Sequence, residues 1–390
     1  MKNSNIIFPP EICTGCGACS ASCPQKCIQM QQNSEGFQYP KIQMDLCIKC
    51  GICKEICPLN TTKHSTEFTF PSLFAAYHRN IIHRRQSTSG GAFAAIAEEV
   101  IAQGGVVFGT AFNNSTCTSV ICRAASNEEE LSVLKTSKYI QSDSSLVYAE
   151  IEKFLQKGQV VLFSGTPCQV AGVHTFFKKN PLRKQLYTCD LICHGVPSPL
   201  AWTQYLKWLS LHFKTTISDF QFRNKQKGWK NSLRSCVLKG KRIFLHGKED
   251  SFSLSFYLNL SLRESCYHCP FDCASRADLT LADFWGIEKT GCIPLKEIRD
   301  GISRIEINTQ HGQQLLSLLN SRLVLYPIQW DKRQTTRPRR PLQRDIFYQA
   351  IKDSWEQVFP LMKVPLSSRM KTAMREYFPE SLLNILRRLS

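Results

Sequence analysis

Short apolar runs alternate with amphipathic stretches of helical length through the middle of the chain. Apolar runs closed by glycine or polar clusters predict strands, and stretches with a 3.6-residue apolar period predict helices. The predicted strands are residues 106–112, 119–124, 160–164, 185–192 and 278–282, and the predicted helices are residues 92–103, 128–134, 145–156, 169 onward and 198–212. Strands alternating with helices predict an α/β domain with a mostly parallel sheet covered on both faces.

Three further apolar segments break this alternation. Residues 220–222, 233–238 and 242–245 lie around the turn Lys239–Gly240. They predict antiparallel additions to the α/β domain. A polar connector at residues 60–72 separates this domain from the N-terminal segment.

Cysteine content changes this picture, because the chain of 390 residues contains 19 cysteines. Residues 1–10 lack the basic segment and apolar stretch of a secretory signal, and no apolar run approaches the roughly 18–20 residues that span a bilayer. We therefore expect a cytoplasmic protein, at most peripheral to a membrane. In that compartment, cysteines in this number are expected to bind metal rather than to form disulfides.

Two motifs of the form C-x2-C-x2-C-x3-C-P occupy the N-terminal segment. In bacterial two-cluster ferredoxins, three cysteines of each motif ligate one [4Fe–4S] cluster and the fourth ligates the other. This assigns Cys13, Cys16, Cys19 and Cys57 to a first cluster, and Cys47, Cys50, Cys53 and Cys23 to a second. The sequence thus predicts an α+β ferredoxin-like 2[4Fe–4S] domain over residues 1–62. A zinc site or disulfide framework is the alternative, disfavoured because the eight-cysteine pattern is far more specific than one C-x2-C pair.

A third group of cysteines is predicted in the α/β domain. Cys168 and Cys193 each follow the carboxyl end of a predicted strand, where ligands collect in open α/β sheets. Cys266 and Cys269 share one turn ahead of the strand at 278–282. These four thiols predict a third [4Fe–4S] cluster. Small buried side chains are the expectation for the cysteines outside such spacing, which are Cys27, Cys117, Cys122, Cys236 and Cys292.

The formal net charge is +18 at pH 7, and each bound cluster with its four thiolates lowers it by about two. Basic side chains are dense in residues 183–248 and 333–344. Such a surface suits nucleic acid, anionic lipid, an acidic electron-transfer partner or a phosphorylated cofactor. A solvated basic face is the commonest explanation.

Several segments carry a resemblance to a known family. They are Ser89-Gly90-Gly91, residues 136–143 (TSKYIQSD), Gly165-Thr166-Pro167-Cys168-Gln169, residues 193–199 (CHGVPSP), residues 222–225 (FRNK) and residues 278–286 (DLTLADFWG). Together they resemble the beta subunit of coenzyme F420-reducing hydrogenase and its dehydrogenase and reductase relatives, from about residue 74 to 285. The resemblance implies a flavoprotein with FAD beside an iron–sulfur cluster. It also places cluster ligands in the segments of Cys168, Cys193, Cys266 and Cys269, with Cys189 and Cys273 as competitors.

FAD requires groups that neutralise its pyrophosphate. Ser87, Ser89, Gly90 and Gly91 precede the predicted helix 92–103 and offer hydroxyls, N–H groups and the positive end of a helix dipole, although an ordinary helix cap would have the same sequence. Lys138 and Gln141 are expected to contact phosphate or the flavin, a solvated lysine being the alternative. His194, beside Cys193, is a candidate catalytic proton donor, or else hydrogen-bonds a sulfur or a carbonyl.

The predicted function is an iron–sulfur flavin-dependent oxidoreductase. An electron-donor or acceptor protein exchanges electrons with the N-terminal clusters, and these pass through the third cluster to FAD and a small two-electron acceptor. The first alternative is an electron-transfer subunit of a larger redox complex without its own substrate site. The second is a basic nucleic-acid-binding iron–sulfur protein. Residues 72–145 and 146–330 are the expected regions of the flavoprotein, and a basic tail with an amphipathic helix at 381–389 is expected over 331–390.

Overall fold

The computed structural model of the chain describes residues 7–60, 72–231, 233–271, 277–329 and 337–362. Three predicted features fall outside these ranges. Cys273 and the helix predicted at 381–389 are wholly outside, and the connector predicted at residues 60–72 is mostly outside. Among the described helices, none has both the length and the apolar character needed to cross a bilayer.

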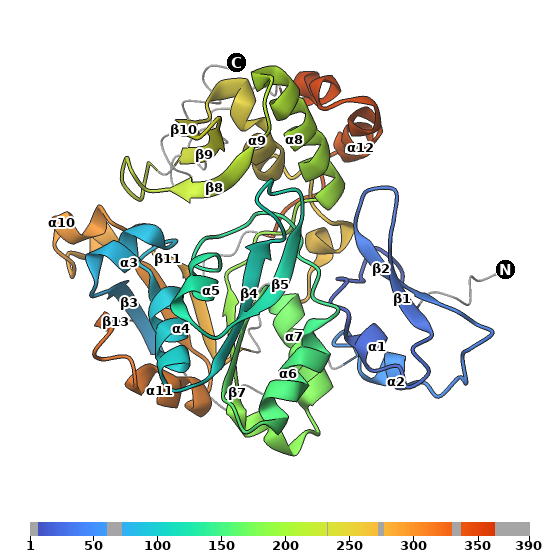
Figure 1. Cartoon of the computed structure of the whole chain (residues 1–390), viewed down its shortest axis with the longest axis horizontal. Coiled ribbons are helices and arrows are strands. Elements are labelled where there is room, and N and C mark those ends of the chain that lie inside the picture. The colour runs from blue at the N-terminus through green and yellow to red at the C-terminus, as the bar shows by residue number, and fades with distance from the viewer. Residues whose placement is uncertain (1–6, 61–71, 232, 272–276, 330–336, 363–390) are drawn as a thin grey trace.

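The N-terminal unit is a small hairpin flanked by two short helices (Figure 1). Strands β1 (Ile28–Gln32) and β2 (Gln38–Ile42) pair in antiparallel fashion. The helices α1 (Ala18–Ala21) and α2 (Ile52–Glu55) each begin after a glycine in the left-handed region, Gly17 with φ of 84° and Gly51 with φ of 77°. The repeated sequence motif therefore folds as a repeated local structure, because glycine alone enters that region without strain.

An eight-stranded sheet forms the centre of the second unit. Its strands, in spatial order, are β13 (Leu323–Ile328), β3 (Ser72–His78), β12 (Ser303–Ile307), β11 (Leu279–Asp283), β7 (Leu186–Leu191), β6 (Val161–Ser164), β4 (Val106–Phe112) and β5 (Val120–Ala125). Only the pairings β11–β7, β7–β6 and β6–β4 are parallel, and the other four are antiparallel.

This mixed sheet corrects the prediction of a mostly parallel one. The predicted strands and helices from residue 92 to 213 are present, but strand direction is decided by pairing with β3, β12 and β13, which come from both ends of the domain. An apolar run does not encode which neighbour it pairs with.

Helices cover both faces of the sheet. The helix α4 (Ala92–Ala102) packs with α11 (Gln310–Ser317) on one face, and α6 (Val147–Gln156) packs with α7 (Pro167–Phe177) on the other. Short connecting elements are α3 (Ile81–Gln86), α5 (Glu128–Ser132), α10 (Leu295–Ile298), η1 (Pro181–Gln185) and η4 (Ile287–Thr290). The N-terminal unit lies on the α6–α7 side, where Ala18 of α1 joins their core.

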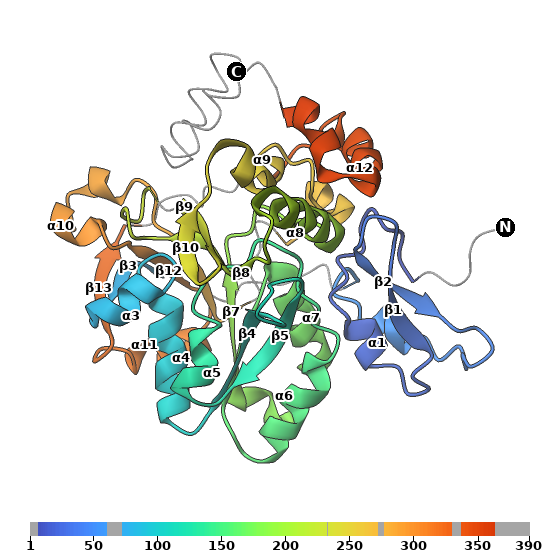
Figure 2. The same cartoon turned by 45° about the horizontal axis from the view of Figure 1, so that its top comes forward.

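A third layer lies across the end of the sheet (Figure 2). It contains α8 (Pro199–Phe213), α9 (Ser251–Tyr257), α12 (Arg344–Asp353), η2 (Gly247–Asp250), η3 (Glu264–His268), η5 (Trp355–Met362) and the strands β8 (Ser218–Asn224), β9 (Leu233–Leu238) and β10 (Lys241–Phe244). The three strands form a separate antiparallel sheet, so the predicted antiparallel segments are not additions to the main sheet.

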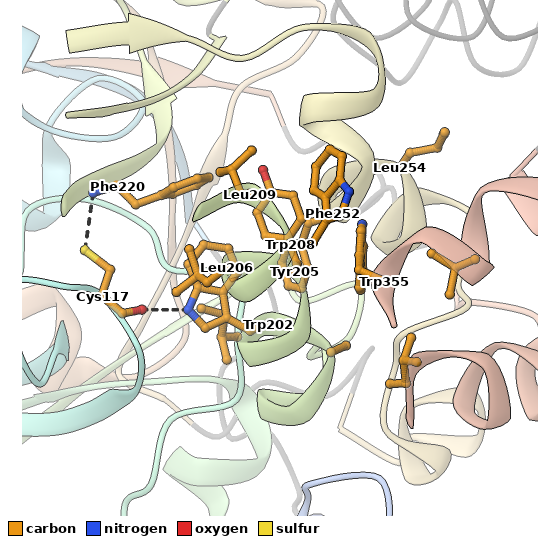
Figure 3. Close-up of a cluster of buried hydrophobic side chains, with 14 of the residues drawn as sticks. Cys117, Trp202, Tyr205, Leu206, Trp208, Leu209, Phe220, Phe252, Leu254 and Trp355 are labelled. Carbon is orange, nitrogen blue, oxygen red and sulfur yellow. Dashed lines mark hydrogen bonds between the residues drawn. The ribbon is translucent and has the colours of Figure 1, made fainter. Parts of the chain in front are cut away.

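The core of this layer is aromatic (Figure 3). Trp202 contacts Tyr205 and Phe252 at ring separations of 5.5 and 4.9 Å, and Phe252 lies 6.1 Å from Trp355. Cys117 joins the main domain to this core, since its carbonyl accepts from Trp202 Nε1 at 2.6 Å and its sulfur accepts from the Phe220 N–H at 3.3 Å. Cys117 is thus a buried packing residue.

A buried charge network fixes α4 against its surroundings. Glu98 accepts hydrogen bonds from His78 Nε2 at 2.9 Å, His83 Nδ1 at 2.7 Å and Lys135 Nζ at 2.8 Å. Its side chain is 2% exposed. Burial by itself would raise the pKa of Glu98, but the bonds from His78, Lys135 and His83 outweigh it and lower the pKa to about 2.

We expect Glu98→Gln to lower the free energy of unfolding at pH 7 by about 3–5 kcal/mol, because Lys135 is left buried without its counter-charge. The wild-type advantage should be complete above the ordinary carboxyl pKa of about 4.5 and should shrink as the pH falls toward 2. Denaturant unfolding followed by tryptophan fluorescence measures both effects. The control is Glu99→Gln, whose partly exposed pair with Arg322 predicts a loss of about 0–1 kcal/mol. Equal losses in the two variants would contradict the interpretation.

Candidate metal centres

The four cysteines assigned to the first cluster come together in the fold. Burial raises the pKa of Cys16 to about 12, with added repulsion from Cys57 and Cys13. Burial likewise raises the pKa of Cys57 to about 11, and Cys13 and Cys53 add to the shift. The pKa of Cys19 is raised by burial and by Cys16, Cys13 and Cys57. Thiols with raised pKa values stay protonated at neutral pH unless a bound metal displaces their protons. This behaviour suits an iron–sulfur ligand set.

The four cysteines assigned to the second cluster are more exposed to solvent than those of the first. The pKa of Cys53 is raised by burial and by the neighbouring Cys50 and Cys47, so the three cysteines of the second motif are also gathered. Cys23 lies against an additional thiol, because its Sγ is 3.4 Å from Cys27 Sγ. Cys27 is buried in a small apolar cluster against which Cys47 also packs, as expected for a small side chain outside the motif. Its contact with Cys23 has no signal in the cysteine spacing.

The two motifs face different surroundings. Cys16 is buried, whereas Cys50 is exposed. Around Cys50, Leu46 is 51% exposed and Ile48 is 61% exposed. The second motif therefore meets solvent through an apolar loop, and the first motif faces the rest of the molecule.

Cys16 is held directly against the α/β domain. Its carbonyl oxygen accepts from the Tyr148 hydroxyl at 2.7 Å and from Ser144 Oγ at 3.2 Å. A Cβ added at Gly172 of α7 would lie 3.1 Å from Cys16 Sγ. Gly172 thus allows the cysteine loop to approach the helix that begins beside Cys168.

The four cysteines predicted in the α/β domain line one cavity. Cys168 lies in the first turn of α7 beyond β6, and Cys193 follows β7, so both stand at carboxyl ends of parallel strands. Cys266 and Cys269 enter from η3 and its end. The pKa of Cys193 is raised by burial and by Cys266, Cys168 and Cys269. The cavity encloses about 480 Å³, counting space open to solvent.

Cys189 does not share this cavity. Its side chain is fully buried in the core that α4 and α11 form on the opposite face of the sheet. Cys189 lies within β7 and faces this core, whereas Cys193 lies two residues beyond the end of β7, where the chain has left the sheet. Cys273 lies outside the described residues.

Arg263 joins the first cysteine loop to this cavity. It is 1% exposed, lines the cavity, and donates from Nε to the Cys13 carbonyl at 2.9 Å. Its other nitrogens donate to the Gln38 carbonyl at 3.0 Å and to Gln141 Oε1 at 2.9 Å. The guanidinium also lies 4.0 Å from the Tyr39 ring centroid. A single arginine among many gives no sequence pattern, so this residue was not predicted.

Comparison with known proteins identifies both units. Residues 12–61 match the 4Fe-4S dicluster domain, and residues 158–329 match the family described as the C terminus of the coenzyme F420 hydrogenase/dehydrogenase beta subunit. The chain therefore combines a 4Fe-4S dicluster domain with a region similar to the C terminus of the F420 hydrogenase/dehydrogenase beta subunit. The predicted resemblance is confirmed, and the chain is an iron–sulfur electron-transfer protein related to these beta subunits.

Other comparisons add little. No curated protein matches the chain. Among solved structures, a chain of the xenon-derivatised F420-reducing [NiFe] hydrogenase complex from Methanosarcina barkeri is similar with a TM-score of 0.48 and 13% identity, over 77% of this chain and 94% of that chain.

The predicted phosphate-binding segment is engaged within the chain. Ser87 Oγ donates to the His83 carbonyl at 2.7 Å, and Ser89 Oγ donates to the Ile302 carbonyl at 2.8 Å. The Gly90 N–H donates to Ser303 Oγ at 2.9 Å. Gly91, with φ of 82°, is the residue that begins α4. As folded, the segment holds α4 against β12 and does not present its hydroxyls outward.

Lys138 and Gln141 lie in a loop that contacts this segment through Ser137 and the first cysteine motif through Gln141. Gln141 Nε2 donates to the Thr14 carbonyl at 3.0 Å while its oxygen accepts from Arg263, so both ends of the amide are engaged. Lys138 donates to the Val133 carbonyl, and burial lowers its pKa to about 7. Gln141 thus helps to seat the first cysteine loop against the α/β domain.

A second cavity lies beside the four-cysteine cavity. It is lined by five aromatic side chains, two arginines and one serine, namely Tyr139, Phe222, Phe252, Phe256, Tyr257, Arg223, Arg234 and Ser253. Arg223 donates to Asp283 Oδ2 at 2.8 Å. His194 connects the two cavities, since it lines the cysteine cavity and its ring is 5.4 Å from Phe256. His194 Nε2 donates to Asn259 Oδ1 at 2.7 Å, which fixes the ring.

We expect Arg263→Gln to lower the reduction potential of the first N-terminal cluster. Reduction adds an electron beside a buried cation, and removing that cation makes the added charge less favourable. Redox titration followed by electron paramagnetic resonance measures the shift. Arg234→Gln is the control, because Arg234 is equally buried but is paired with Asp250 and lines the aromatic cavity rather than the cysteine cavity. A shift of the same size in both variants would contradict this role.

Proposed function

We propose that the chain is an iron–sulfur flavoprotein oxidoreductase that carries electrons inward from its dicluster domain to a third [4Fe–4S] cluster, and from there to FAD and a two-electron acceptor. The observation that carries the proposal is the convergence of Cys168, Cys193, Cys266 and Cys269 on one cavity beside the first cysteine motif.

The chemistry of this cavity favours iron–sulfur ligation. Among the described residues, its lining carries four thiols and no carboxylate, a donor set that suits either zinc or a [4Fe–4S] cluster. Two facts favour the cluster. The cavity lies against a dicluster domain, and Cys168 is close enough to Cys16 for its charge to raise the pKa of Cys16.

Burial gives the relay a direction in space. The second motif, with exposed Cys50, is where a protein partner can approach. The first motif is buried against α7, and Arg263 connects it to the cysteine cavity. Electron exchange with a partner therefore takes place at the second cluster, and the first cluster stands between it and the third.

FAD would supply the conversion of single electrons into a two-electron transfer. The aromatic cavity has room for about one water molecule as folded, and its arginines are paired with Asp283 and Asp250, so it would have to open to admit the flavin ring. The segment predicted to bind the pyrophosphate does not offer free donors in this conformation. The Ser87 and Ser89 hydroxyls and the Gly90 N–H are hydrogen-bonded within the chain. The Gly91 N–H likewise donates to the Thr88 carbonyl at 3.1 Å, and Lys138 donates to the Val133 carbonyl, so an anion at this segment would have to displace these bonds.

The convergence of the four cysteines on one cavity also supports one alternative, an electron-transfer subunit without its own substrate site. His194 would then only hold the cavity wall through Asn259 rather than deliver a proton. The nucleic-acid alternative rests on the net positive charge alone.

We expect anaerobically purified protein to contain about twelve irons per chain. Cys168→Ser and Cys266→Ser should each remove about four of them, since each takes one ligand from the third cluster. Cys189→Ala should leave the iron content unchanged, because Cys189 belongs to the opposite core. Unchanged iron in both serine variants would remove the third cluster from the proposal.

The same preparation decides between the two functions. About one acid-extractable FAD per chain, with reduction of a small acceptor, supports the oxidoreductase. Full iron content without flavin and without acceptor reduction supports the electron-transfer subunit.

We expect Ile48→Glu to slow reduction by a protein donor such as reduced ferredoxin at least several-fold, because a charge disrupts the apolar loop beside the second cluster. Reduction by dithionite should be unchanged. Ile82→Glu is the matched control, since Ile82 is also 61% exposed but lies on α3. Stopped-flow absorbance measures both rates, and equal rates in the two variants would exclude this loop as the docking site.

A further inference from the structure

A fifth thiol lies against the ligands proposed for the second cluster. Cys27 Sγ is 3.4 Å from Cys23 Sγ, and Cys47 packs against the small apolar cluster to which Cys27 belongs. Cys27 is 2% exposed, whereas Cys23 is only half-buried. The cysteine motif ends at Pro24, so the pattern assigns Cys27 no role.

The backbone presents the two thiols from different supports. Cys23 lies at the start of a turn in which the Lys26 N–H donates to the Cys23 carbonyl at 3.0 Å. Cys27 precedes β1, and its carbonyl accepts from the Gln43 N–H at 2.8 Å, which continues the β1–β2 ladder. The hairpin therefore holds Cys27 in place independently of the turn that holds Cys23.

Simple packing accounts for part of this arrangement. Cys27 belongs to a small apolar cluster with Ile7 and Ile28, and free cysteine is often a small buried side chain. Packing explains the burial. It does not explain why the Cys27 sulfur contacts the sulfur of a proposed cluster ligand.

We infer that Cys23 and Cys27 serve the same iron of the second cluster, an inference that rests on the ligand set proposed above. Each iron of a cubane takes one thiolate at its own corner, so two sulfurs in contact serve one corner and not two. Cys23 ligates this iron, and the Cys27 S–H donates to the Cys23 sulfur. When Cys23 is lost, Cys27 ligates in its place and its proton leaves to solvent.

Two consequences follow for the second cluster. A thiol that can replace Cys23 makes the cluster tolerant to loss of that ligand. A hydrogen bond to a ligating sulfur stabilises the reduced, more negative cluster and so raises its reduction potential.

The internal repeat provides a matched control. Cys57 has in the second motif the place that Cys23 has in the first. Cys27 is four residues after Cys23, and the residue four after Cys57 is Thr61. The corner proposed for Cys57 therefore has no equivalent thiol at that position in the sequence.

The test compares alanine variants of the full chain, purified without oxygen, by iron and sulfide content and by electron paramagnetic resonance after reduction. Cys23→Ala should keep the wild-type iron content, whereas Cys23→Ala with Cys27→Ala should lose about four irons. Cys57→Ala by itself should lose about four irons. Cys27→Ala should keep all iron and show one cluster with a lower reduction potential.

Other outcomes overturn the inference. Loss of about four irons in Cys23→Ala alone would show that Cys27 cannot ligate, and the same loss in Cys27→Ala alone would make Cys27 the resident ligand. An unchanged potential in Cys27→Ala would remove the hydrogen bond. Iron retained in Cys57→Ala would show that loss of a fourth ligand is tolerated without a neighbouring thiol, and would overturn the role given to Cys27 in Cys23→Ala. Wild-type protein without iron would instead refute the proposed function, so the two failures are distinguishable.

Discussion

The seating of the first cysteine loop on the α/β domain is the contact on which the arrangement of the redox sites depends. Tyr148 and Ser144 bond the Cys16 carbonyl, Arg263 bonds the Cys13 carbonyl, and Gly172 leaves room for Cys16. These bonds use backbone oxygens of the loop, so the cysteine sulfurs remain directed at their own centre. A loop bound through its backbone is fixed in position without loss of its ligands.

The same contact explains why the carboxyl ends of β6 and β7 are the place for a third set of thiols. Parallel strands end at one edge of the sheet, and the chain segments that follow them converge there. The third layer supplies the remaining wall, since η3 carries Cys266 and Arg263 precedes it by three residues. One short segment therefore provides both a thiol for the cavity and the cation that reaches the dicluster domain.

Buried charge is paired in the same way in the rest of the molecule. Glu98, Asp250 and Asp283 each face a buried cation or several donors. Each such pair removes one positive and one negative charge from the surface, so it leaves the net charge of +18 unchanged. Net charge reports on the whole chain, whereas partner binding depends on the charges that remain in solvent.

The cysteine spacing, the helices and most strands of the central region could be predicted from the sequence, because they depend on residues close together in the chain. Ligand spacing is set by local covalent geometry, and apolar periodicity is set by the pitch of a helix or the pleat of a strand. The convergence of Cys168, Cys193, Cys266 and Cys269 was also expected, since strand ends imply a shared edge. Only the tertiary structure decided the mixed direction of the sheet, the separate antiparallel layer, the exclusion of Cys189, the inward bonding of Ser87 and Ser89, and the roles of Arg263 and Cys27. Each of these depends on which distant segments pack together, and that is determined by the fold as a whole rather than by any local pattern.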